Sequence, residues 1–440
     1  MAIQSMTRSN TRDVQATASE CMGAFDAGAR LMRMAVPDNE SLQALDRVHR
    51  RIRESGYEQP LAADIHFRPE LAIGAAKIVE KVRINPGNFF SLPRHKRSLA
   101  AGGTASGYLE ALREAMAPLV GACLRHGTAL RVGVNAGSLP PHIGQGAGHG
   151  PEGMVEAALE YLQVFESLGF HQLVLSLKSA RVGDNVRASR WLFSGLKGTK
   201  RPYPLHIGMT EAGSAMAGRV KSAMALLPLL LQGIGSTLRV SLTEGASEEI
   251  AFGESLIRHA SQYATPSSQP KGPPLDREGV LRIISEATSV DDLVVDAVCQ
   301  YVLATDEVFR PCNALHPCKE VVVEGPPPLK SAALELAARI MQAGGIRPYE
   351  TEFISCPACA RVAVDMAELL MQVKEHLSGY PGLRIAVMGC MVNGPGEMAD
   401  ADYGFIVAGK GKLNLYRGRR LLRKNLPADE AISTLQAILA

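Results

Sequence analysis

Aromatic residues are scarce in this chain, at 5% of 440 residues with a single Trp. This scarcity argues against the stacking platforms that bind single-stranded nucleic acid. The formal charge is only +3, from 47 basic and 44 acidic residues. We therefore expect no broad electrostatic surface for nucleic acid or membranes. No apolar run reaches the ~18 residues of a transmembrane helix.

The first 13 residues lack a basic stretch followed by an apolar segment, so the sequence predicts no signal peptide and a cytoplasmic protein. In that compartment the eight cysteines are expected to be free, metal-bound or catalytic rather than paired in disulfides. Hydrophobic residues make up 46% of the chain. This fraction is enough for a large core, and the length indicates two or three domains.

Short apolar segments alternate regularly with amphipathic ones over the first 264 residues. The expected strands are 2–6, 31–36, 61–65, 81–84, 130–134, 172–177, 205–209 and 237–242. The expected helices are 14–27, 42–54, 69–79, 106–125, 153–168, 182–196, 215–230 and 247–263. Eight strands and eight helices in strict alternation predict a (β/α)8 TIM barrel over 1–264, with an open parallel sheet as the alternative.

A different pattern follows the barrel. Pro-rich segments bound an insert at 265–329, which is predicted to hold helices 280–287 and 290–305 and a strand 320–323. Residues 330–440 are predicted to form a small α+β domain. Its expected helices are 330–343, 360–377 and 428–439, and its expected strands are 349–354, 383–388, 403–408 and 412–416.

Cationic residues recur where the barrel strands end: Arg33, Arg83, Arg131, Lys178 and Arg239. Catalytic sites of such barrels lie at these ends. Buried cations are costly unless an anion meets them, and the Arg fork matches phosphate oxygens. We therefore expect a phosphorylated substrate, with the polar residues Asn85, Asn135 and Ser241 beside it. The alternative is a rim of salt bridges, for which the same face offers few acids.

Three further residues at these strand ends are candidates for acid–base work. Glu211 could move protons near the phosphate cluster, or could be the structural partner of one Arg. Asp64 and His66 are also candidates, although a lone acid and a lone imidazole at a barrel rim more often serve as hydrogen-bonding scaffold.

The C-terminal domain carries the sharpest motif. Cys356 and Cys359 form a Cys-x-x-Cys pair after one predicted strand, and Cys390 ends the next. Three converging thiolates suit an iron–sulfur cluster or zinc. A zinc site would need a fourth Cys or His, whereas the local sequence offers Glu397 beyond a Gly-Pro-Gly turn. A carboxylate is a poor permanent ligand for cluster iron, so an exchangeable, catalytic iron is the favoured interpretation.

The other cysteines carry weaker signals. Cys21, Cys123 and Cys299 fall in helical patterns and are expected to be small core residues. Cys312 and Cys318, together with His316, match no standard zinc spacing, and we expect no metal there.

Several short segments of the sequence resemble one known family. They are QSMT (4–7), LAADIHF (61–67), RINPGN (83–88), RVGVNAGSL (131–139), TEAG (210–213), TLRVSL (237–242), CPAC (356–359) and GCMVNGPGE (389–397). In this order they resemble the 4-hydroxy-3-methylbut-2-enyl diphosphate synthases of the non-mevalonate isoprenoid pathway. The resemblance spans residues 3–262 and about 345–440.

The resemblance implies a barrel joined to a reductase-like domain. It implies a [4Fe-4S] cluster held by Cys356, Cys359, Cys390 and Glu397. The implied substrate is 2-C-methyl-D-erythritol 2,4-cyclodiphosphate, which is reduced by two electrons from ferredoxin or flavodoxin with ring opening and loss of water. It also implies a homodimer in which the cluster domain of one chain caps the barrel of the other.

Two departures from the family accompany this resemblance. The chain begins almost at QSMT, whereas relatives usually have a preceding strand segment, and the 265–329 insert is intermediate in length between the compact and the plant-like forms. Two other functions stay open from the residues alone. One is a phosphate-binding barrel enzyme with a structural zinc domain, and the other is an iron–sulfur redox sensor, for which a fourth Cys would be expected instead of Glu397.

Overall fold

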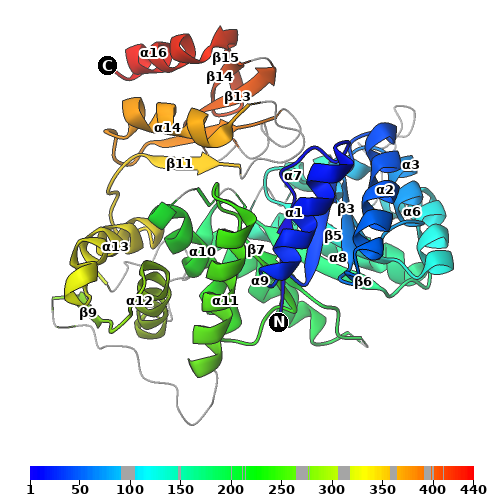
Figure 1. The fold of residues 1–440 in the computed structure, drawn as a ribbon, viewed down its shortest axis with the longest axis horizontal. Helices are drawn as coiled ribbons and strands as arrows, with labels where there is room; N and C mark the ends of the chain where they lie inside the picture. Colours follow the sequence, from blue (N-terminus) through cyan, green and yellow to red (C-terminus); the bar gives the residue numbers. More distant parts are fainter. Residues whose placement is uncertain are drawn as a thin grey trace.

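The computed structural model describes residues 1–90, 105–146, 150–199, 201–210, 212–213, 215–263, 276, 278–305, 318–356, 364–390, 398, 401–409 and 411–440. Its N-terminal part is a ring of parallel strands surrounded by helices (Figure 1). The strands are β1 (Ala2–Met6), β2 (Leu31–Ala35), β3 (Leu61–Ile65), β4 (Lys81–Ile84), β5 (Ala129–Asn135), β6 (Leu173–Lys178), β7 (His206–Gly208) and β8 (Thr237–Arg239).

The order of the strands in the sheet is β6-β5-β4-β3-β2-β1-β8-β7. The ring is completed where Leu175 of β6 forms a parallel bridge to Leu205, next to β7. Successive parallel strands that return to the first one are the arrangement of a TIM barrel. The predicted barrel is therefore confirmed, and the alternative of an open sheet is wrong.

The helices around the barrel follow the predicted order. They are α1 (Val14–Asp26), α2 (Asn39–Glu54), α3 (Pro69–Ala75), α6 (Ala105–His126), α8 (Pro151–Ser167), α9 (Val182–Leu196), α10 (Ala215–Leu230) and α11 (Ala246–Tyr263), with the short α4 (Pro86–Phe89) and α7 (Pro141–Gly146) as unpredicted additions. Local sequence fixes where some of them begin. The Asp13 side chain accepts a hydrogen bond from Ala16 N, and Asp38 does the same for Ser41 N, so each Asp caps a helix.

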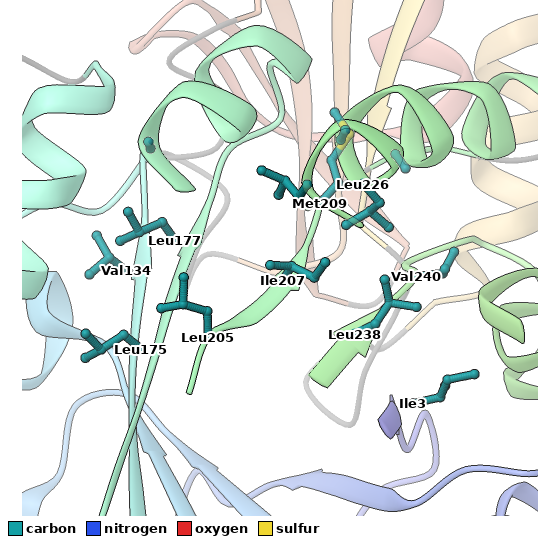
Figure 2. Close-up of a cluster of buried hydrophobic side chains, with 14 of the residues drawn as sticks. Ile3, Val134, Leu175, Leu177, Leu205, Ile207, Met209, Leu226, Leu238 and Val240 are labelled. Carbon is teal, nitrogen blue, oxygen red and sulfur yellow. The ribbon is translucent and has the colours of Figure 1, made fainter. Parts of the chain in front are cut away.

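The apolar core of the barrel lies between the strands and the helices. Figure 2 shows one part of it, where Ile207, Leu238 and Val240 from the strand segments gather with Leu226 of α10. Side chains alternate between the two faces of a strand. Because these apolar residues pack toward the helices, the residues between them, such as His206 and Arg239, belong to the inner face.

The insert forms a small unit against the barrel helices. It contains β9 (Val280–Ile284), α12 (Val290–Ala304), β10 (Glu320–Glu324) and the 3-10 turn η2 (Pro327–Leu329), and it is followed directly by α13 (Lys330–Ala343). The strands β9 and β10 pair in parallel, and α12 packs on α10 and α11. The apolar side of α13, including Leu336 and Ile340, joins the same core as the barrel.

The predicted helix at 280–287 is wrong, because residues 280–284 form the strand β9. Val280, Leu281, Ile283 and Ile284 are mostly β-branched, and burial alternates along the strand, with Leu281 and Ile283 buried. These properties favour a strand once a parallel partner is available. That partner, β10, lies about 40 residues further along the chain, beyond any local pattern.

The C-terminal unit is a five-stranded sheet with its own apolar core. The strands are β11 (Glu352–Ser355), β12 (Arg384–Met388), β13 (Tyr403–Gly409), β14 (Lys412–Arg417) and β15 (Arg420–Pro427), in that spatial order, with helices α14 (Met366–Leu377) and α16 (Ala428–Leu439) packed on it. The strands β11, β12 and β13 run parallel, and β14 and β15 complete the sheet in antiparallel fashion. Strand β15 was not predicted.

The C-terminal unit lies over one end of the barrel, with β11 nearest to it (Figure 1). Among the residues that the structure describes, no helix is both long and apolar enough to cross a membrane.

Candidate functional site

The inner face of the barrel is polar and mainly cationic. The inward positions of the strands and their ends hold Gln4, Arg33, Asp64, Lys81, Arg83, Arg131, Asn135, Ser176, Lys178, His206, Arg239 and Ser241. Inner positions of such barrels are normally filled by branched apolar residues. A charged interior of this kind is costly unless a bound anion offsets the repulsion.

The structure brings together all five cations that the sequence singled out. Arg33, Arg83, Arg131, Lys178 and Arg239 are each between 2% and 7% exposed. Burial, followed by repulsion from Arg239 and Arg131, lowers the pKa of Lys178 well below its usual value. Burial and the neighbouring Arg33 and Arg83 likewise lower the pKa of Arg131. Mutual repulsion at this density favours binding of a multiply charged anion.

Several donor atoms of these arginines meet a weak acceptor or, among the described residues, no acceptor. Arg33 Nη2 lies 2.9 Å from the thioether sulfur of Met6, and Arg239 Nη1 lies 3.9 Å from it. A thioether is a weak acceptor. The buried Nε atoms of Arg83, Arg131 and Arg239 have no hydrogen-bond partner among the described residues. Phosphate oxygens are the strong acceptors that such donors would prefer.

Asp64, His66 and Arg83 form a buried network. Arg83 Nη1 donates to Asp64 Oδ1 at 2.9 Å and lies 2.9 Å from His66 Nε2, and Arg83 Nη2 donates to Gly133 O at 2.9 Å. Burial alone would raise the pKa of Asp64, but Arg33 and Arg83 hold it well below its usual value. Asp64 therefore stays ionised, which suits a residue that orients Arg83 better than one that donates a proton.

Two glycines make room for the cations. A Cβ at Gly208 would lie 2.6 Å from Lys178 Nζ, and a Cβ at Gly133 would overlap Arg83 Nε. Both positions face into the barrel, so the absence of a side chain there lets the long cationic side chains cross the interior.

The three neutral polar candidates are also buried: Asn85, Asn135 and Ser241. Asn85 has a local task, because its Oδ1 accepts from Gly87 N at 3.2 Å and its Nδ2 donates to Ser138 Oγ at 2.9 Å. It thereby caps α4, which follows the end of β4.

Sequence reasoning missed several inner residues, chiefly Glu249, Lys81 and His206. Glu249 of α11 is buried, lies 3.5 Å from Arg239 and accepts from Ser5 Oγ at 2.8 Å. The expectation that the face offers few acids thus left this partner unidentified. Burial, Arg131 and Arg33 lower the pKa of Lys81 to about 7. Every second residue of a strand points to the same face, so the series Lys81, Arg83 and Asn85 could have revealed that Lys81 faces inward. The same spacing could have revealed His206, two residues before Gly208.

Cys356 and Cys390 lie at the ends of two adjacent parallel strands, β11 and β12. Gly389 N donates to Cys356 Sγ at 3.3 Å, so the thiol of Cys356 reaches the end of β12. Both thiols are half-buried. Glu211, Cys359 and Glu397 lie outside the described residues, as do Cys312 and His316.

The remaining described cysteines are buried: Cys21, Cys123, Cys299 and Cys318. Burial raises the pKa of Cys123 and of Cys299 to about 12. These thiols therefore stay protonated, as expected of core residues.

The end of β11 meets the rim of the barrel. Ser355 forms a parallel bridge to Ala212, which follows β7. Nearby, Lys221 Nζ of α10 donates to Glu352 Oε1 at 2.7 Å, and Arg384 of β12 lies 3.0 Å from the other oxygen of Glu352. Because Cys356 follows Ser355 directly, the cysteine-bearing edge of the small sheet faces the end of the barrel that carries the cations.

Comparison with known proteins agrees with this two-part organisation. Residues 1–254 match the model of the GcpE TIM-barrel domain, and residues 352–440 match that of the GcpE protein C-terminal domain. The two matches together include the barrel strands and the cysteine-bearing sheet.

Curated relatives span nearly the whole chain. A protein of Akkermansia muciniphila named 4-hydroxy-3-methylbut-2-en-1-yl diphosphate synthase (flavodoxin) is 32% identical over 98% of this chain and 92% of its own length. A Prochlorococcus marinus protein with the same enzyme name and the qualifier ferredoxin is 33% identical over 100% of this chain and 88% of its own. With both domain models and these relatives in agreement, the chain belongs to the GcpE family, that of the 4-hydroxy-3-methylbut-2-en-1-yl diphosphate synthases.

Proposed function

We propose that this chain converts 2-C-methyl-D-erythritol 2,4-cyclodiphosphate into 4-hydroxy-3-methylbut-2-en-1-yl diphosphate, a precursor of isoprenoids. Two electrons open the ring at a carbon–oxygen bond and expel a hydroxyl group, which takes up one proton and leaves as water. The observation that carries this proposal is the bridge between Ala212 and Ser355, because it brings a thiol-bearing strand end to the rim of a cationic barrel.

In this proposal the barrel binds the two phosphates. Arg33, Arg131, Lys178 and Arg239 offer charge and donors to the phosphate oxygens, and Arg83 does so while held by Asp64. Asn85, Asn135 and Ser241 add neutral polar groups at the same strand ends. Because the cations are already in place and buried, phosphate binding requires little rearrangement and excludes water from the reacting carbon.

Glu211 is the proposed proton donor to the departing hydroxyl. In the sequence it directly precedes Ala212, which bridges Ser355 of the small sheet. His66 is the second candidate. Its Nε2 lies 2.9 Å from Arg83 Nη1 and 3.4 Å from Asp64 Oδ2, so the imidazole belongs to the same buried network.

The residues of the small sheet fit an iron–sulfur cluster. Two thiols follow the ends of adjacent strands, and a backbone N–H donates to one sulfur, as is common around cluster sulfurs. We propose that Cys356, Cys359, Cys390 and Glu397 would hold a [4Fe-4S] cluster. When bound, the cluster supplies electrons one at a time, which flavodoxin or ferredoxin would deliver to it.

The proposed division of labour assigns residues 1–264 to the substrate, 330–440 to the cluster and 265–329 to an insert. We place the protein in the cytoplasm, where its cysteines stay reduced. A homodimer is part of the family resemblance and of this proposal.

Anaerobic purification followed by iron and sulfide analysis tests the cofactor, and dithionite-driven turnover of the cyclic diphosphate tests the reaction. We expect about four irons and four sulfides per chain, as the proposed cluster type requires. We also expect the product to appear on mass spectrometry. Zinc in place of iron would support the structural-zinc alternative, and a full iron content without turnover would support a redox sensor.

A further inference from the structure

The hairpin β14–β15 of the small sheet is strongly basic. Residues 412–427 contain six cations and no acid: Lys412, Arg417, Arg419, Arg420, Arg423 and Lys424. The whole chain has 47 basic and 44 acidic residues, so the rest of it holds 41 and 44 and has a net charge of −3. Positive charge is therefore concentrated on this hairpin, whereas basic and acidic residues nearly balance in the rest of the chain.

This basic hairpin, residues 412–427, is exposed at the edge of the sheet. β15 pairs with β14 on one side only and is the last strand of the described sheet. All six cations are exposed, and Arg420, Arg423 and Lys424 form no ion pair with a described residue. The acids that follow, Asp429 and Glu430, lie in the first turn of α16. Figure 1 shows β15 on the side of the small sheet that faces away from the barrel.

The open end of the hairpin and the cysteines share one edge of the sheet. β12 and β13 are parallel, whereas β13–β14 and β14–β15 are antiparallel, so β15 runs in the same direction as β12. The end of β15 near Lys424 and the start of β14 at Lys412 therefore lie at the edge where β12 ends, before Cys390. Three strand spacings separate β12 from β15, which is about 14 Å.

We propose that the basic hairpin is the docking surface for a small acidic electron carrier of the flavodoxin type. This inference rests on the proposed function, in which such a carrier supplies electrons one at a time. Each encounter oxidises the carrier by one electron, and two encounters supply the pair that opens one substrate ring. Opposite charge on the two surfaces would speed and orient these brief encounters.

A simpler role for the charges is protection of an edge strand against aggregation. Protection does not require a single sign or six charges, and it does not require placement on the cysteine-bearing unit. Docking accounts for the single sign and for the three cations at the cysteine-bearing edge, Lys412, Arg423 and Lys424, whereas Arg417, Arg419 and Arg420 surround the turn at the other end of the hairpin.

The test compares two reductants on three proteins. The first variant combines Lys412→Gln, Arg423→Gln and Lys424→Gln. The matched control combines Arg47→Gln, Arg50→Gln and Arg51→Gln, which removes the same charge from the exposed side of α2 on the barrel, far from the small sheet (Figure 1). Turnover of the cyclic diphosphate is measured with reduced flavodoxin and, separately, with dithionite.

We expect the hairpin variant to show a KM for flavodoxin raised by at least about tenfold at low salt, within the range of electrostatic steering. Its dithionite-driven turnover should match that of the unmodified protein, and the control should be normal with both reductants. The difference should shrink as salt is added.

An unchanged KM in the hairpin variant would reject the docking surface and leave edge protection. So would turnover of the unmodified protein with dithionite but not with flavodoxin. Failure of the unmodified protein with dithionite would instead count against the proposed function itself, so the two failures are distinguishable.

Discussion

Burial and the neighbouring arginines together set the protonation state of Lys178. Burial comes first and the adjacent arginines second, and both lower its pKa well below the usual value. Without a bound anion the ammonium therefore loses its proton more readily than that of an exposed lysine. A diphosphate brought close to the amine favours the ammonium form and raises the pKa again.

Substrate binding should accordingly take up protons. We expect the binding enthalpy of the cyclic diphosphate at pH 8, measured by calorimetry, to differ between two buffers of unlike ionisation enthalpy in the direction of uptake. Lys178→Met should reduce the uptake and weaken binding. Identical enthalpies in both buffers for the unmodified protein would show that Lys178 does not change its protonation.

Gly133 controls the position of Arg83, because any Cβ there would overlap Arg83 Nε. Gly133→Ala should push the guanidinium away from Asp64 and lower the free energy of unfolding by about 1–3 kcal/mol, as overpacking does. We expect the KM for substrate to rise about tenfold or more. Chemical denaturation and steady-state kinetics measure the two effects.

Gly23 provides the matched control. It lies inside α1, and a Cβ there would meet nothing within 4 Å. Gly23→Ala should leave kinetics unchanged and stabilise the protein by up to about 1 kcal/mol. Equal effects of the two substitutions would mean that the interior has room for Arg83 to move aside.

At the scale of elements, Glu352 joins β11 to the barrel. It accepts from Lys221 of α10 and lies beside Arg384 of β12. Burial alone would raise its pKa, but Lys221 and Arg384 lower the pKa of Glu352 to about 2. A carboxyl with a lowered pKa stabilises the folded state fully above its unfolded pKa of about 4.3 and loses that contribution as the pH falls toward 2.

Glu352→Gln should loosen the contact between the two units. We expect faster amide hydrogen exchange in β11 and a loss of about 1–3 kcal/mol, since Lys221 and Arg384 lose a shared acceptor. The loss should be present at pH 6 and shrink between pH 4 and 2. Glu335→Gln removes only a half-exposed partner of Arg339 and should cost less than 1 kcal/mol. Unchanged hydrogen exchange in β11 would show that other contacts hold the C-terminal sheet against the barrel.

Local sequence predicted most elements, because the barrel strands are short and rich in apolar residues and most helices are amphipathic. The bounds of β1, β3 and β4 were predicted to the residue. The elements that were predicted wrongly or missed are strands that depend on long-range pairing. β9 requires β10 as a partner, and β15 is so rich in charge that alternation gives no signal until β14 holds it in the sheet.

The residues of the candidate site likewise divide into those that local sequence predicts and those that only the folded structure reveals. The cations at strand ends were predictable, because charge is rare in buried parallel strands. Glu249 was not predictable, since an acid in the first turn of a helix is usually solvated, and only the folded arrangement places it 3.5 Å from Arg239.

At the scale of the whole molecule, the two units of one chain touch each other. The bridge between Ala212 and Ser355 lies within a single chain, whereas the family resemblance implies that one chain caps the barrel of its partner. A mixing experiment separates these arrangements. One variant carries Glu211→Gln and the other carries Cys390→Ser, so that each lacks one half of the proposed machinery.

Each variant alone should be inactive or nearly so. If closure occurs within a chain, as the contacts here favour, co-expressed variants should show no more activity than the sum of the two. Recovery of a substantial part of the normal activity in the mixed dimer would show that the units close across chains. Turnover of the cyclic diphosphate with dithionite is the measurement.

The cationic interior of the barrel also makes the stability of the folded protein depend on the concentration of its ligand. A ring of strands whose inner face repels itself is less stable when empty than when it holds an anion, so the ligand acts as part of the core. By mass action, ligand at 100 times its Kd adds about 2.7 kcal/mol to the free energy of unfolding. A cell rich in the precursor would thus protect the protein from unfolding and proteolysis, and a cell that lacks it would lose the protein faster, so that supply would set abundance without any separate regulator.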